Sequence, residues 1–201
     1  MIPDTYLTVK SFTQGLYKEK GSRFISFVWP VSDEEEIRSI LENTRKEHHS
    51  ARHHCYAWVL GPQRDHFRAN DDGEPSGSAG KPILGQINSR NLTNILIVVV
   101  RYFGGKLLGV SGLINAYRSA AASALGNAGI VECQIREKLG LIFPYASLND
   151  VMRIIKEEEI TISEQRFELE CSMTVSVRAS SLEHVINQLS RIENIIIRKD
   201  L

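Results

Sequence analysis

The hydrophobic positions of this chain recur with two different periods. Residues 95–100 are six consecutive apolar residues, rich in β-branched side chains and too few for an isolated helix. They predict a strand that is buried on both faces. Further along, apolar residues recur at helical spacing over residues 113–125, which predicts a helix that Gly126 or Gly129 ends and that Ser111 caps at its start.

The same patterns predict other elements before the buried strand. We expect strands at residues 5–10, 15–20, 22–30, 53–60 and 66–70. We expect one helix at residues 33–46, with Ser32 or Asp33 as its cap and acidic residues in its first turn. A short helix near residues 79–88 is expected to be capped by Ser76 or Ser78. This part of the chain is therefore predicted to be an α+β domain.

A boundary is predicted near residues 132–138, after which the order of elements becomes β-α-β-β-α-β. The expected elements are residues 139–144, 148–158, 160–166, 168–178, 181–191 and 195–198. This order is typical of a ferredoxin-like fold. Alternation predicts one buried sheet face, formed by Phe167, Leu169, Cys171, Met173, Val175 and Val177. The open face is expected to carry Glu168, Glu170, Ser172, Thr174 and Ser176, which disfavours the stacking of RNA bases.

Composition limits the classes of protein that fit. With 201 residues, 42% of them hydrophobic, the chain can bury a sizeable core. The formal net charge is zero, so any binding to nucleic acid must rest on a local patch of cations. Three cysteines, an odd number, indicate reduced thiols in a cytoplasmic protein. We expect neither a signal peptide nor a membrane span, because no suitable apolar run occurs.

The segment RYFGGK, from Arg101 to Lys106, brings two cations, two aromatic rings and two glycines to the end of the buried strand. Together with the start of the next helix, it predicts a site for an anion such as phosphate. The glycines have a second interpretation, in which they only permit close packing between strand and helix. The glycine spacing matches neither common nucleotide signature, and we expect no cofactor.

Two other clusters could carry chemistry. The loop with Asp71, Asp72 and Glu74 could hold magnesium or supply a general base, or it could be a turn whose acids complement a helix dipole. Five histidines fall in or near EHHSARHHCYAW. Because neighbours on a strand point to opposite faces, His53 and His54 cannot chelate one ion together, and we expect no metal site.

Taken together, the motifs ARHHCYAWVLG, DDGEPSGSAGKPIL, VVVRYFGGKLLG and GLINAY closely resemble the YigZ/IMPACT family. The resemblance implies an N-terminal domain, residues 1–135, similar to the ribosomal-protein-type domain IV of elongation factor G. It implies a ferredoxin-like C-terminal domain at residues 136–201. Where relatives usually read L-L-G-T-G-G-L, this chain has LLGVSGL, so Val110 replaces a hydroxyl that Ser111 restores one place later.

The resemblance also implies a non-enzymatic cytoplasmic regulator linked to translation, because eukaryotic relatives regulate translation by binding an activator of a starvation-sensing kinase. We therefore expect the partner to be RNA, the ribosome or a translation-related protein. The predicted phosphate or nucleic-acid contacts are Arg52, His53, Lys81, Arg101, Tyr102, Gly104, Gly105, Lys106, Gly109 and Ser111. Two alternatives remain open: a hydrolase or phosphotransfer enzyme that uses Asp71, Asp72 or Glu74, and a protein-docking adaptor.

Overall fold

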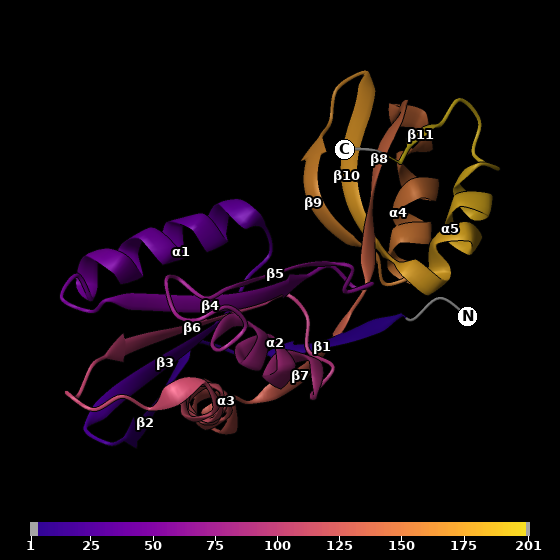
Figure 1. Cartoon of the computed structure of the whole chain (residues 1–201). Helices are drawn as coiled ribbons and strands as arrows, with labels where there is room; N and C mark the ends of the chain where they lie inside the picture. The colour runs from indigo at the N-terminus through magenta and orange to yellow at the C-terminus, as the bar shows by residue number, and fades with distance from the viewer. Residues whose placement is uncertain (1–3, 200–201) are drawn as a thin grey trace. The chain divides into compact units, whose positions relative to one another are not determined.

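The computed structural model describes residues 4–199, which divide into two compact units (Figure 1). The N-terminal unit comprises residues 6–133. The C-terminal unit comprises residues 134–199 together with residues 4 and 5. Within residues 4–199, no helix is both long enough and apolar enough to cross a membrane. The protein is thus an α+β chain of two units.

A five-stranded sheet forms the centre of the N-terminal unit. Its strands, in spatial order, are β2 (Thr13–Glu19), β3 (Ser22–Pro30), β6 (Ile95–Tyr102), β4 (His53–Leu60) and β5 (His66–Asn70). Every neighbouring pair in this sheet is antiparallel. The buried strand predicted at residues 95–100 is confirmed as the middle strand, and each of its six residues is buried.

Helices cover both faces of this sheet, which is why β6 has no polar face. On one face, α1 (Glu34–Glu47) covers alternate residues of β6, namely Leu96, Val98 and Val100. On the other face, α2 (Gly80–Asn88) and α3 (Gly109–Asn127) cover Ile95, Ile97 and Val99. Each such side chain contributes about 1.5–3 kcal/mol when it is fully buried. The sheet is therefore rigid where it positions residues at the end of β6.

The starts of the three helices differ from one another. Asp33 caps α1 as predicted, since its Oδ1 accepts a hydrogen bond of 2.8 Å from the Glu36 amide. The predicted cap Ser111 is wrong, because α3 begins at Gly109 and Ser111 already lies inside its first turn. Ser76 and Ser78 do not cap α2 either, since its cap position is Ala79, which makes no side-chain hydrogen bond.

A two-stranded sheet of β1 (Thr5–Val9) and β7 (Ile130–Gln134) lies where the chain enters and leaves the N-terminal unit. The β7 strand was not predicted from the sequence. Asp4, which precedes β1, belongs to the C-terminal unit. Its carboxylate accepts a hydrogen bond from the Ser180 amide and pairs with Arg178, and its carbonyl oxygen accepts from the Ile135 amide.

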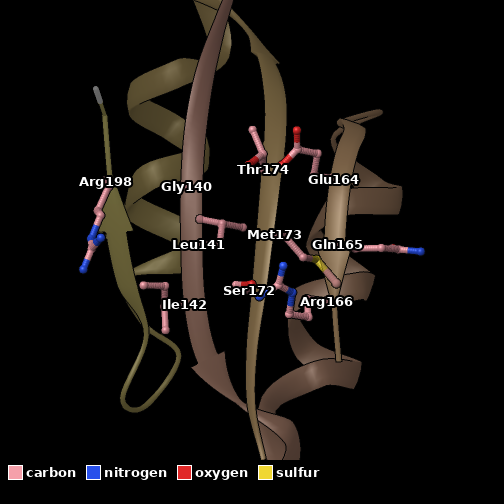
Figure 2. Close-up of a pocket in the computed structure, with 10 residues that line it drawn as sticks. All are labelled: Gly140, Leu141, Ile142, Glu164, Gln165, Arg166, Ser172, Met173, Thr174 and Arg198. Atoms are coloured by element: carbon pink, nitrogen blue, oxygen red, sulfur yellow. The ribbon is translucent and has the colours of Figure 1, made fainter. Parts of the chain in front are cut away.

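The C-terminal unit has the predicted order β-α-β-β-α-β. Its elements are β8 (Arg136–Pro144), α4 (Leu148–Glu157), β9 (Thr161–Arg166), β10 (Glu170–Arg178), α5 (Leu182–Leu189) and β11 (Ile196–Arg198), with short 3₁₀ turns at Tyr145–Ser147 and Ala179–Ser181. The spatial order of the antiparallel strands is β11-β8-β10-β9. Both helices lie on one face of the sheet, and the other face is left open (Figure 2).

The alternation predicted for β10 holds from Cys171 to Val177, where every second side chain is buried. It is wrong for Phe167 and Leu169, because these residues lie before the strand in the β9–β10 turn. Leu169 is 95% exposed as a result.

Candidate nucleic-acid interface

Three chain segments meet at one end of the five-stranded sheet. Arg23 at the start of β3 is the register partner of Tyr102 at the end of β6, and His53 at the start of β4 is the partner of Arg101. The β2–β3 turn, the α1–β4 connection and the loop after β6 therefore lie at the same end (Figure 1). Eight exposed cationic residues lie in these segments, in the last turn of α1 and in the first turn of α2, and one of them, Arg45, is paired with Asp72. The other seven define the basic end: Lys18, Lys20, Arg23, Lys46, Arg52, Lys81 and Lys106.

The cations of the basic end are not held in salt bridges. None of its seven cations forms a salt bridge with a carboxylate in residues 4–199. Two carboxylates, those of Glu19 and Glu47, belong to the same segments, and Glu19 accepts a hydrogen bond from the Tyr17 hydroxyl. The nearby loop contributes three more carboxylates: those of Asp72 and Glu74 are paired with arginines, whereas that of Asp71 keeps its charge and interacts electrostatically with Lys81.

Asp71 accepts hydrogen bonds from backbone amides at the start of α2. Its carboxylate accepts hydrogen bonds of 2.8–2.9 Å from the amides of Gly77, Ala79 and Gly80. Burial raises the pKa of the Asp71 carboxyl, but these hydrogen bonds outweigh burial and hold the pKa below its ordinary value. Asp71 thus caps the start of α2, the role that was expected of Ser76 or Ser78.

Asp72 binds residues at the end of α1 and at the start of β4. One carboxylate oxygen lies 2.9 Å from Arg45 Nη2, and the other accepts a hydrogen bond of 2.6 Å from the His54 amide. The Asp72 carbonyl oxygen lies 2.8 Å from His53 Nδ1. Because a carbonyl oxygen only accepts, Nδ1 must carry a proton in this contact.

Glu74 is occupied by a buried arginine. Its Oε1 accepts hydrogen bonds of 2.6 Å from Arg101 Nη1 and 2.7 Å from the Tyr117 hydroxyl. The side chain of Glu74 is 3% exposed and that of Arg101 is 8% exposed. Arg101 Nε is buried and is bonded to no acceptor among the described residues. Arg101 is therefore unavailable to a phosphate on the surface of this structure, contrary to the sequence prediction.

The rings around Arg101 explain how its charge is tolerated in the interior. The guanidinium carbon lies 5.5 Å from the ring centre of Phe24 and 5.6 Å from that of Phe103, so both aromatic rings contact the cation.

A second buried contact joins Cys55 and Tyr117. The Cys55 thiol lies 3.3 Å from the Tyr117 hydroxyl. Burial raises the pKa of both the Cys55 thiol and the Tyr117 hydroxyl, which keeps both groups protonated.

The glycine turn after β6 has a packing function at Gly104. A Cβ at this position would lie 1.9 Å from the carbonyl carbon of Gly21, so only glycine lets the two loops approach. The Gly104 amide donates a hydrogen bond of 3.1 Å to Ser22 Oγ and is not free to bind an anion. Gly105, with φ of +84°, and Lys106 are exposed beyond this contact.

Aromatic rings lie among the cations of the basic end. The guanidinium of Arg23 sits 5.1 Å from the ring centre of Tyr102, whose hydroxyl lies 2.8 Å from His48 Nδ1. Phe103 is 51% exposed beside the turn. Cations interleaved with exposed aromatic rings are typical of surfaces that bind nucleic acid.

A groove of about 360 Å³ lies between the first half of α2 and α3. It is lined by seven residues that include no carboxylate: Gly77, Lys81, Pro82, Gly85, Gln86, Ile114 and Arg118. Lys81 of the basic end and Arg118 therefore line the same groove. Arg118 is a cation that the sequence prediction did not include.

The structure brings together most of the residues predicted to bind phosphate, although not all are accessible. Arg52, Lys81, Gly105, Lys106, Gly109 and Ser111 are exposed, Tyr102 and His53 are half-buried, and Arg101 and the Gly104 amide are occupied inside. Sequence analysis missed Lys18, Lys20 and Arg23. The alternation of cations in YKEKGSR was the signal that could have indicated them.

Comparison with known proteins finds similarity along nearly the whole chain. Residues 20–125 match the family model described as "Impact N-terminal domain". An "IMPACT family member" of Haemophilus influenzae is 33% identical over 190 residues, covering 92% of this chain and 91% of that protein. "IMPACT family member YvyE" of Bacillus subtilis is 37% identical over 161 residues, covering 80% and 74%. A solved structure described as "Crystal structure of an hypothetical protein" has a TM-score of 0.77 and 28% identity, covering 99% of this chain and 98% of that one.

Proposed function

Because the chain belongs to the IMPACT family, we propose that it is a translation-linked regulator that binds ribosomal RNA through the basic end. The observation that carries this proposal is the set of seven cations without salt-bridge partners beside a loop in which two of the three carboxylates, Asp72 and Glu74, are paired with arginines. The link to translation rests on the family resemblance, since its eukaryotic members regulate translation. The proposal places the protein in the cytoplasm.

The physical basis of binding is the neutralisation of phosphates. Lysine and arginine displace counterions from RNA, so the affinity depends steeply on salt. With a net charge of zero, the protein has no general attraction for RNA, and the basic end must supply the local field. The exposed ring of Phe103 can stack on an unpaired base, and the half-buried ring of Tyr102 lies beside it in the chain. Backbone contacts of this kind carry no preference for a particular sequence.

The finer fold assignments belong to the same proposal. We infer that the N-terminal unit is similar to domain IV of elongation factor G and that the C-terminal unit is ferredoxin-like. The strand order β11-β8-β10-β9 and the β-α-β-β-α-β order support the second assignment. The first likeness is to a domain of a factor that acts on the ribosome.

A protein-docking adaptor is the second candidate, favoured by one observation. Leu107 is 85% exposed, and Phe103 and Val110 are each about half exposed, so the loop after β6 and the first turn of α3 present three large apolar side chains. Exposed apolar side chains that are close in sequence are typical of contacts with protein. A hydrolase is less well supported, because Glu74 alone of the three carboxylates lies against Arg101 and within 4.0 Å of His53 Nε2.

Binding of ribosomal RNA and intact ribosomes across a salt series tests the proposal. We expect affinity at low salt, with a logarithmic slope that the double variant Lys20→Gln/Lys106→Gln reduces by roughly 1.4–1.8, at about 0.7–0.9 for each lost phosphate contact. The matched control Arg38→Gln/Arg68→Gln removes two exposed cations from α1 and β5 and should leave the slope unchanged.

Two outcomes would reject RNA binding at the basic end: no affinity at low salt, or a slope equally reduced by the control. Retained binding to ribosomes that is insensitive to salt but lost in Leu107→Ser would support the adaptor instead.

A further inference from the structure

The open face of the C-terminal sheet carries rows of side chains that can be read from the strand register. One row crosses the sheet as Arg198, Gly140, Thr174 and Glu164, from β11 through β8 and β10 to β9. The next row is Ile196, Ile142, Ser172 and Arg166. Both rows point away from α4 and α5, because the alternate residues Leu141 and Met173 are buried in the core under the helices.

A groove of about 320 Å³ lies on these two rows (Figure 2). Gly140 contributes no side chain to its floor, and Ser172 and Thr174 add hydroxyl groups. Arg166 extends from β9 over β10 toward Ser172, while Arg198 lies at the opposite side on β11 (Figure 2). The groove thus has two hydroxyl groups and the apolar side chain of Ile142 on its floor, with an arginine on each side.

The charge of the open face is positive, although the chain as a whole is neutral. The register adds two more rows to the same face, so that its cations are Arg136, Lys138, Arg166, Arg178 and Arg198. The carboxylates on this face are those of Glu164 and Glu170. Arg178 is paired with Asp4, whereas neither Arg166 nor Arg198 forms a salt bridge with any carboxylate in residues 4–199.

We propose that this groove is a second RNA site, which holds the sugar–phosphate backbone of a single strand that crosses the sheet from β11 to β9. The inference rests on the proposed function and adds a contact that is separate from the basic end. Three strand spacings of about 4.8 Å place the edge strands roughly 14 Å apart. The two arginines therefore come from opposite edges of the sheet, and each can bind a phosphate of a strand that crosses it.

The floor of the groove favours contacts with the sugar–phosphate backbone of RNA over contacts with its bases. Its lining includes no aromatic residue, so bases have no ring on which to stack. Ser172 and Thr174 can instead donate hydrogen bonds to phosphate oxygens or exchange them with ribose hydroxyls. Recognition is consequently of single-stranded RNA without preference for sequence.

Fluorescence anisotropy of the full chain with labelled oligouridine tests this site across a salt series. We expect Arg166→Gln/Arg198→Gln to reduce the logarithmic salt slope by about 1.4, at about 0.7 for each contact with a single strand. The matched control Arg153→Gln/Arg191→Gln removes two exposed arginines from α4 and the segment after α5 and should leave the slope unchanged. Thermal unfolding of each variant verifies that the sheet is intact.

An unchanged slope in the intact Arg166/Arg198 variant would overturn this second site while Lys20→Gln/Lys106→Gln still tests the basic end. Unchanged RNA binding with lost ribosome binding would overturn it too, and would assign the groove to a ribosomal protein. If the wild-type chain binds no RNA at all, the proposed function fails and this site fails with it.

Discussion

Arg101 and Glu74 form an ion pair of 2.6 Å inside the N-terminal unit, 27 positions apart in the chain. A buried pair of this kind adds little net stability over an apolar substitute, but removing one partner leaves an uncompensated charge. The pair therefore fixes the acidic loop to the end of β6 and makes each residue dependent on the other. The pair lies directly beneath the basic end. The positions of the surface residues there therefore depend on this buried ion pair.

Glu74→Gln should lower the free energy of unfolding by about 3–5 kcal/mol, because the guanidinium of Arg101 would remain buried without its counter-charge. Urea titration followed by circular dichroism measures this loss. Glu42→Gln, an exposed change on α1, should cost less than about 0.5 kcal/mol and serves as the control. A loss below about 1 kcal/mol for Glu74→Gln would show that the pair carries no such dependence.

Gly104→Ala should destabilise the N-terminal unit by about 1–3 kcal/mol or more, since its Cβ would lie 1.9 Å from backbone of the β2–β3 turn. Gly85→Ala offers the opposite case, because that glycine lies within α2 and an added methyl group would meet nothing within 4 Å. There, alanine should stabilise by about 0.5–1 kcal/mol. Thermal melts of the two variants should shift in opposite directions, and a shift in the same direction contradicts the packing argument.

Asp71→Asn should lose about 1–3 kcal/mol at neutral pH, because three amide hydrogen bonds to a charged acceptor are weakened. The folded state holds the pKa of Asp71 below its ordinary value of 3.8, so its contribution is complete above that value and disappears as the pH falls through the folded pKa. The difference between wild type and variant should therefore shrink between pH 5 and pH 2. A difference that is constant over this range would contradict the assignment of Asp71 as the cap of α2.

Cys133 should react with iodoacetamide at pH 8 faster than the other two cysteines. Cys55 and Cys171 are buried, and burial raises the pKa of the Cys55 thiol, whereas Cys133 is partly exposed on β7. Mass spectrometry of peptides after timed labelling measures the three rates. Denaturation in urea should equalise them, and rapid labelling of Cys55 in the folded protein would show that the buried network opens.

Features that depend on local pattern could be predicted from the sequence. The short, β-branched apolar run at residues 95–100 predicted a strand buried on both faces, and Ser32 or Asp33 before a turn of acids predicted the start of α1. The order of elements in the C-terminal unit followed from alternation and helical spacing. In each case the signal lies within a dozen residues of the element itself.

Features that depend on distant pairing could not be predicted. Arg101 reads as a free cation beside glycines, and its burial becomes evident only when Glu74 is placed against it. Lys20 joins Lys106 at the basic end because β3 lies between β2 and β6, and the sequence does not specify that order. The same limit explains why β7 was missed, since its partner β1 is more than 120 residues away.

The attachment of Asp4 to the C-terminal unit has a consequence for biosynthesis. Its carboxylate bonds to the Ser180 amide, a residue made 176 positions later. At about 5–20 residues per second, this first anchor waits roughly 9–35 s on the ribosome for its partner. The N-terminal unit can fold during that delay, whereas the C-terminal unit must bind a segment of chain that was translated before the N-terminal unit.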